Sequence, residues 1–174
     1  MLFTKTKIDG LLIINIESKA DHRGSLDRFF CQHELAEHGI DFTLAQAYRS
    51  TSLLKNTLRG LHYQTSPKSE IKIIQCLRGA IFDLVIDLRP DSATYGQWQS
   101  VELTADNQAL LLVPQHCAHG YMTLTDNCLV ECLASEFYAP EYEAGVRWND
   151  PAFQITWPNS NPIVSDKDQS WALR

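Results

Sequence analysis

Residues 71–92 read IKIIQCLRGAIFDLVIDLRPDS, and this stretch decides the fold class. It contains two short apolar runs, 71–77 and 80–88, which are rich in isoleucine, leucine and valine and have the length of single strands. The second run ends in LRPDS, where the proline cannot donate a backbone hydrogen bond to a sheet. The stretch therefore predicts two β-strands with a sharp end to the second.

Seven similar runs lie on either side of this stretch, and turn residues separate them. Strands of this number and spacing are typical of a sandwich or barrel, and the double-sheet jelly roll matches the pattern best. Helical periodicity occurs only near residues 32–39, where Gly39 would stop a short helix, and again near 165–171. The further runs are LLIINIE (11–17), TLRGLHYQ (57–64), WQSVELT (98–104), ALLLVP (109–114), HGYMTL (119–124), CLVECLA (128–134) and FQITW (153–157).

Length and composition bound the remaining possibilities. The chain has 174 residues, 44% of them hydrophobic and 21% charged, so we expect a single domain over residues 1–174. We expect this domain to be all-β, a jelly-roll sandwich with short peripheral helices. A net charge of −6 gives no general basic surface for nucleic acid or anionic lipid, but it leaves room for a local arginine cluster at a phosphate.

The cellular compartment is predicted from two features. The N-terminal apolar run is broken by Asn15 and Glu17 and is too short for a secretory core or a membrane span. The five cysteines are odd in number, form no CxxC pair and lie mostly inside apolar runs, so we expect most of them to be buried free thiols. The sequence therefore predicts a cytoplasmic protein with no membrane partner.

Polar side chains inside the apolar strands mark a candidate site. The segment LRGLHYQ places Arg59 and His62 in one strand, and Gly60 permits a local bulge. Lys72 and Asp83 lie in two other apolar strands. Each has a structural alternative, since a lone histidine is often a satisfied core residue and a lysine can extend to the surface. His116 begins the segment HCAHG (116–120), which follows Val113 and Pro114, and it could also be a solvated loop residue. Burying several such groups separately would be costly, so we expect them to converge in one cavity.

The chain contains the motifs LRGLHYQ, IFDLVIDLRPDSATYGQW, VP followed by AHGY, EFYAPEYEAGVRWNDP, and ITWP followed by SDKD, in this order. Their order resembles that of the dTDP-4-dehydrorhamnose 3,5-epimerase family. The resemblance spans residues 21–168 and is specific because many motifs share order and spacing. It implies a double-stranded β-helix (cupin-type) fold, a homodimer, and no metal or organic cofactor.

The resemblance also implies the reaction and its catalytic groups. A ketone at C4 of a hexose acidifies the C3 and C5 protons, so epimerisation needs a base, an acid on the opposite face, and a cationic group at the enolate oxygen. By resemblance, His62 is the base, Asp168 orients it, Lys72 stabilises the enolate and His119 lines the pocket. The implied activity is that of a nucleotide-linked 4-keto-6-deoxy-sugar epimerase at C3, C5 or both, in deoxysugar biosynthesis.

The resemblance assigns the remaining site residues to a nucleotide-diphosphate sugar. Arginine suits bidentate contact with phosphate, and the positions that match a diphosphate grip are Arg23, Arg59 and Lys167. Tyr138 matches an aromatic position that packs on the nucleotide base. Gln46 and Asp83 complete the expected substrate contacts.

Three positions depart from the family pattern. The family's catalytic tyrosine lies eight residues before the proline of its Y-A-P motif, where this chain has Cys132, a much shorter side chain that also reads as a buried thiol. Tyr48 stands where the family has an asparagine, and Arg28 where it has a glutamate. We expect both positions in the pocket, and we hypothesise that Tyr48 supplies the missing hydroxyl.

Two other functions compete with an epimerase. The first is a metal-dependent cupin, an isomerase or dioxygenase that binds a divalent ion through His62, Glu70 and His119, although this strand carries one histidine where such cupins have two. The second is a non-catalytic sugar-nucleotide-binding protein, for which the retained His62 and Asp168 would have no use.

Overall fold

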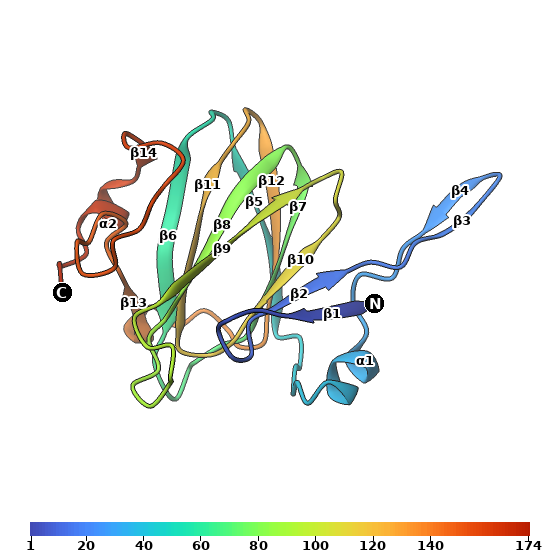
Figure 1. The fold of residues 1–174 in the computed structure, drawn as a ribbon, viewed down its shortest axis with the longest axis horizontal. Helices are drawn as coiled ribbons and strands as arrows, with labels where there is room; N and C mark the ends of the chain where they lie inside the picture. Colours follow the sequence, from blue (N-terminus) through green and yellow to red (C-terminus); the bar gives the residue numbers. More distant parts are fainter.

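The computed structural model describes all residues 1–174 and contains two antiparallel sheets that face each other (Figure 1). The first sheet runs in the order β1 (Leu2–Lys5), β2 (Leu12–Asn15), β10 (Leu110–Val113), β7 (Lys72–Arg78), β12 (Cys128–Ala134) and β5 (Gln46–Ser52). The second runs in the order β13 (Glu143–Gly145), β6 (Thr57–Gln64), β11 (Cys117–Thr123), β8 (Ala80–Asp87) and β9 (Trp98–Thr104), with β14 (Ile163–Val164) parallel to β6. The predicted all-β jelly-roll sandwich is confirmed.

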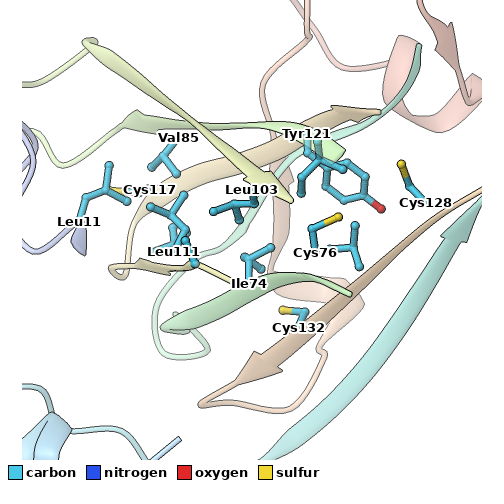
Figure 2. Close-up of a cluster of buried hydrophobic side chains, with 14 of the residues drawn as sticks. Leu11, Ile74, Cys76, Val85, Leu103, Leu111, Cys117, Tyr121, Cys128 and Cys132 are labelled. Atoms are coloured by element: carbon cyan, nitrogen blue, oxygen red, sulfur yellow. The ribbon is translucent and has the colours of Figure 1, made fainter. Parts of the chain in front are cut away.

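The main core lies between the two sheets, as Figure 2 shows. It forms because side chains of one parity along each strand point inward. Ile74 and Val130 come from the first sheet, and Val85, Leu103 and Tyr121 come from the second. Four of the five cysteines are buried, and all five are free thiols, as the sequence predicted.

Two smaller apolar clusters cover the outer faces of the sheets. Leu35 of the helix α1 (Gln32–Glu37) packs with Phe42 against the outer face of the first sheet. The segment 153–157 packs against the outer face of the second sheet through Phe153, Ile155 and Trp157. This segment was predicted to be a strand, and that prediction is wrong, because its apolar side chains cover a sheet without joining its ladder.

The short helices lie at the periphery, as predicted. The helix α1 is followed by Gly39, whose φ of +76° ends it in a conformation that favours glycine. The helix α2 (Asp166–Gln169) begins at Ser165, whose hydroxyl accepts a hydrogen bond from the amide of Asp168. A 3₁₀ turn, η1 (Pro140–Tyr142), precedes β13. No helix is long and apolar enough to cross a membrane.

A β-hairpin projects from the sandwich (Figure 1). It consists of β3 (Lys19–Asp21) and β4 (Gly24–Leu26), and every residue in both strands is exposed. The hairpin forms a separate two-stranded sheet. Its side chains therefore lie outside the intersheet space that holds the core.

Candidate active site

A cavity of about 350 Å³ opens between the two sheets. A second cavity of about 310 Å³ adjoins it and shares His62, Lys72 and Tyr48 with the first. Both volumes lie at the lower end of the range for small-molecule sites. These three shared side chains therefore stand at the junction of the two cavities, and they come from both walls, because β6 belongs to one sheet and β7 and β5 to the other.

Close approach of two glycines sets the position of His62. Gly60 has a φ of +116°, and a Cβ there would lie 2.6 Å from the Cα of Gly120. The pairing of β6 with β11 shifts register at this point, between His119 and Tyr121. The bulge predicted from Gly60 is thus present, and it places His62 opposite His119 on the neighbouring strand.

His62 and Asp168 form a pair whose geometry suits a general base. The Nε2 atom of His62 lies 2.6 Å from Oδ1 of Asp168, while the amide of Gly60 donates to Oδ2 over 3.3 Å. An ionised carboxylate can only accept a hydrogen bond, so Nε2 of His62 carries the proton and donates a hydrogen bond to Asp168, which leaves Nδ1 unprotonated. The His62 side chain is 30% exposed, and that of Asp168 is 6% exposed.

The pKa of Asp168 supports this arrangement. Burial alone would raise that pKa, but hydrogen bonds from His62, Gly60 and the helix cap at Ser165 outweigh it and lower the pKa. The carboxylate therefore stays ionised, and it can both fix the imidazole tautomer and stabilise an imidazolium.

Trp171 covers one side of the base. Its ring lies 6.2 Å from the His62 ring in an edge-on arrangement. Gly145 is the register partner of His62 on β13, and a Cβ there would lie 2.2 Å from Trp171. A glycine is thus needed for the indole to lie beside His62, so the C-terminal segment helps to shape the site.

Lys72 projects into the cavity from the wall opposite His62. Its Nζ atom lies 2.9 Å from Oε1 of Glu70, and each side chain is 9% exposed. The same ammonium donates to the backbone oxygen of His62 over 3.5 Å. A nearly buried cation at this position can stabilise negative charge on a substrate oxygen between the sheets.

A second histidine–aspartate pair, His119 and Asp83, lies beside the first. The Nε2 atom of His119 is 2.5 Å from Oδ1 of Asp83, and the side chains are 9% and 0% exposed. Oδ2 of Asp83 has no hydrogen-bond partner. His119 lines the cavity as predicted, whereas Asp83 lies beneath it and is held away from the cavity surface.

The predicted phosphate-binding residues separate into two groups. Arg59 and Lys167 line the first cavity, where Arg59 donates to Ser52 and Lys167 donates to both carboxylate oxygens of Glu143 at 2.7 Å. Arg23 instead lies on the projecting hairpin, where its 78% exposed side chain pairs with Asp21. The structure therefore does not bring Arg23 into the cavity of its own chain.

The predicted nucleotide-contact residues line the second cavity. Tyr138 is 54% exposed and donates its hydroxyl proton to Glu143 over 2.8 Å. Gln46 lines the same cavity and accepts from the amide of Tyr138 over 3.3 Å. The buried amide of Gln64 donates to the backbone of Lys68 and Phe137. Gln64 thus fixes the loop that carries Tyr138.

The three divergent positions have different outcomes. Cys132 and Tyr48 are register partners on β12 and β5, and both line the cavity. Burial raises the pKa of the Cys132 thiol to about 11, although a hydrogen bond with Tyr48 and the charge of Lys72 act in the opposite direction. Arg28 was expected in the pocket, but it lies outside the cavity of its own chain, on the surface, where it pairs with Glu34 at 3.1 Å.

The residues of the alternative metal site have other partners. His62 is bound by Asp168, His119 by Asp83, and Glu70 by Lys72. No group of three histidine, cysteine, aspartate or glutamate side chains has the geometry to hold a metal ion. The metal-dependent hypothesis thus lacks the ligand set on which it depended.

Sequence reasoning named Glu70 and Lys72 but did not pair them, and it missed Glu143, Tyr121 and Ser50. Glu70 and Lys72 point to the same face because they are two residues apart on an extended chain, a spacing that could have paired them. Glu143 holds both Tyr138 and Lys167, and Tyr121 bonds to Ser50. The contacts of Glu143 with Lys167 and of Tyr121 with Ser50 span 24 and 71 residues, so no local signal marked them.

Comparison with known proteins gives matches to epimerases of dTDP-linked sugars. Residues 5–173 match the family model described as dTDP-4-dehydrorhamnose 3,5-epimerase. The enzyme of that name from Methanothermobacter thermautotrophicus is 38% identical over 97% of this chain and 92% of its own length. A dTDP-4-dehydrorhamnose 3-epimerase from Streptomyces niveus is 35% identical over 95% of this chain and 80% of its own. The Bacillus anthracis 3,5-epimerase structure with TDP and PPi bound superposes with a TM-score of 0.95 at 36% identity, covering 99% of both chains.

Proposed function

The chain belongs to the dTDP-4-dehydrorhamnose 3,5-epimerase family, and from that premise we propose the substrate, the chemistry and the assembly of this epimerase. The substrate is a dTDP-linked 4-keto-6-deoxy sugar, and the product serves deoxysugar biosynthesis. The observation that carries the proposal is the His62–Asp168 pair facing Lys72 across one cavity. The retained pair also favours an enzyme over the alternative of a sugar-nucleotide-binding protein.

The proposed reaction begins with proton removal by Nδ1 of His62 from a ring carbon beside the ketone. The electron pair of the broken C–H bond moves into the carbonyl, and Lys72 stabilises the resulting enolate oxygen. Asp168 stabilises the imidazolium that forms. Return of a proton to the opposite face of the same carbon regenerates the ketone and inverts the centre.

The diphosphate and the nucleotide are assigned to the mouth of the site. The chain has a net charge of −6 and therefore no general attraction for a diphosphate. Arg59 and Lys167 line the first cavity and provide positive charge locally, where a diphosphate would bind. Tyr138 and Gln46 line the adjoining cavity, where the exposed phenol ring offers a face for stacking on the base. His119 contributes to the wall beside the sugar.

A homodimer accounts for the projecting hairpin. Arg23 lies outside the cavity of its own chain, so a role at the diphosphate requires the hairpin of one subunit to reach the cavity of its partner. The hairpin residue Leu26 is 75% exposed and Phe29, just beyond it, is 44% exposed, which provides apolar surface for such a contact. Sedimentation should then give twice the chain mass of 19.8 kDa, and Leu26→Glu should reduce it.

The chain acts as a single domain in the cytoplasm in this proposal. The apolar clusters on both sheets draw on residues from Ile8 to Trp157, which supports one folding unit. The five free cysteines suit a reducing compartment.

The test is proton NMR of the purified protein in deuterated water with dTDP-4-keto-6-deoxyglucose. We expect the C3 proton, the C5 proton or both to exchange, and an inverted stereoisomer to accumulate. CDP- and GDP-linked sugars serve as matched controls for the nucleotide. If neither exchange nor a new stereoisomer appears while the dTDP-sugar binds, the epimerase proposal is wrong and the binding-protein alternative stands.

A further inference from the structure

Inversion of a carbon needs a proton donor on the face opposite the base. His62 lies on β6 of the second sheet, so the donor belongs on the facing first sheet. Side chains with a transferable proton that line the cavity from that sheet are Lys72, Cys132, Tyr48 and Ser50. The structure distinguishes among them by position and by existing partners.

Three of these groups are poorly placed. Lys72 is held by Glu70 at 2.9 Å and serves the enolate oxygen. Cys132 has a much shorter side chain than tyrosine, is only 4% exposed, and packs with the apolar core (Figure 2), so its thiol reaches little of the cavity that it lines. Ser50 shares a hydrogen bond with Tyr121. Tyr121 comes from β11, in the sheet that carries His62, and its hydroxyl is already hydrogen-bonded to Ser50.

Tyr48 occupies the required position. It is the register partner of Cys132, so the small thiol leaves room for the phenol to extend over it. Tyr48 is also one of the three side chains common to the two adjoining cavities, together with His62 and Lys72. The base, the cation and the phenol therefore all lie at the junction of the two cavities, with the base on one sheet and the other two on the facing sheet.

The surroundings of Tyr48 keep its proton in place until it is needed. The pKa of Tyr48 is raised well above its usual value. The largest cause is burial of the phenol against the sheet, and the nearby Cys132 and Glu70 act in the same direction. The residue as a whole is nevertheless 47% exposed, so solvent can restore the proton after transfer. A protonated phenol that can exchange with water is what an acid in repeated turnover requires.

We propose that Tyr48 is the acid that delivers a proton to the sugar carbon from the face opposite His62. This inference rests on the proposed epimerase function. In the step, the O–H bond of Tyr48 breaks, a C–H bond forms on the enolate carbon, and the electron pair returns to the carbonyl. The phenolate then takes a proton from water while the imidazolium of His62 releases one to water.

The test separates exchange from inversion in Tyr48→Phe. Without the phenol, His62 can still remove a proton and return deuterium from its own face. We therefore expect deuterium to enter the ring at a rate within about 10-fold of wild type, while the inverted stereoisomer forms about 10²- to 10³-fold more slowly. The conservative change at a half-exposed position should leave the thermal unfolding midpoint unchanged, which checks folding.

Cys132→Ser and Tyr121→Phe test the two rival donors in the same assay. Inversion at the wild-type rate in Tyr48→Phe, or its loss in either rival variant alone, would overturn the inference. Equal loss of exchange and inversion in a folded Tyr48→Phe that binds substrate would also overturn it, since Tyr48 would then act before proton return. Failure of the proposed function itself differs from all of these, because the wild-type protein would show no exchange.

Discussion

Two histidine–aspartate pairs lie side by side in this molecule, and only one has the features of a catalytic base. His62 and His119 are register partners, and each Nε2 contacts an aspartate. The His62 side chain is 30% exposed, and both oxygens of Asp168 have donors. His119 is 9% exposed, and one oxygen of its buried aspartate has no partner.

Two properties distinguish the pairs: the exposure of the histidine side chain and the element that carries the aspartate. Asp168 comes from a short helix at the end of the chain, and it orients an imidazole whose other nitrogen reaches the cavity. Asp83 comes from β8 in the middle of the sheet, and it holds His119 in a fixed place in the wall. We therefore propose a catalytic role for the first pair and a structural role in the cavity wall for the second.

The largest expected contrast is between the two aspartates. Asp168→Asn should lower kcat about 10²- to 10⁴-fold, because the imidazole loses its fixed tautomer and its stabilising charge. Asp83→Ala should instead lower the free energy of unfolding by about 1–3 kcal/mol, because it leaves the buried His119 nitrogen unpaired. Steady-state kinetics and urea unfolding measure the two effects. Equal loss of kcat without loss of stability in both variants would remove the distinction.

Lys72→Met should have the next largest effect. Loss of the ammonium removes the cation assigned to the enolate oxygen, so we expect kcat to fall about 10²-fold. The substitution also leaves Glu70 without its partner. Glu70→Gln is therefore the matched control. If Glu70→Gln lowered kcat as much as Lys72→Met, the effect would belong to the pair and not to the cation.

Lys167→Ala should change binding more than chemistry. Its 52% exposed side chain lies at the rim of the cavity, so we expect KM to rise several-fold with kcat nearly unchanged. The rise in KM should shrink as salt increases, because exposed charges are screened. A fall in kcat with unchanged KM would place Lys167 at the reacting carbon instead.

The smallest expected effect concerns acid stability. The pKa of Asp168 is lower in the folded protein than in the unfolded chain, where an aspartate has a pKa of about 3.9. The ionised carboxylate therefore stabilises the folded state at any pH above about 3.9, and this stabilisation is lost as the pH falls through the lower, folded-state pKa. The difference in unfolding free energy between wild type and Asp168→Asn should therefore shrink below about pH 4. A difference that is constant from pH 7 to pH 3 would contradict this.

Much of the fold was predictable because the buried strands carry strong local patterns. The runs at β7, β8 and β12 are apolar on both faces, since each lies between the intersheet core and an outer cluster. β5 was missed because its sequence QAYRSTS has polar residues on both faces, one lining the cavity and the other exposed. The segment FQITW (153–157) was wrongly predicted to be a strand because it is apolar, although its apolar side chains only cover the outer face of a sheet.

The site residues that lie in recognisable sequence motifs could be predicted. His62, Lys72, Asp168, Arg59 and Lys167 meet in the first cavity as expected. Arg23 and Arg28 do not meet them, because the segment that carries both leaves the sandwich, and no local pattern predicts where a polar hairpin points. The facing of Cys132 and Tyr48 depends on strand pairing across 84 residues, which periodicity alone cannot give.

The most direct test of the central claim compares His62→Asn with His119→Asn by deuterium exchange into the C3 and C5 positions of dTDP-4-keto-6-deoxyglucose. We expect His62→Asn to lower the exchange rate by at least about 10³-fold in a folded protein, and His119→Asn to lower it by about 10-fold or less. Exchange that persists in His62→Asn and disappears in a folded His119→Asn would contradict the account, because the base would then belong to the other pair.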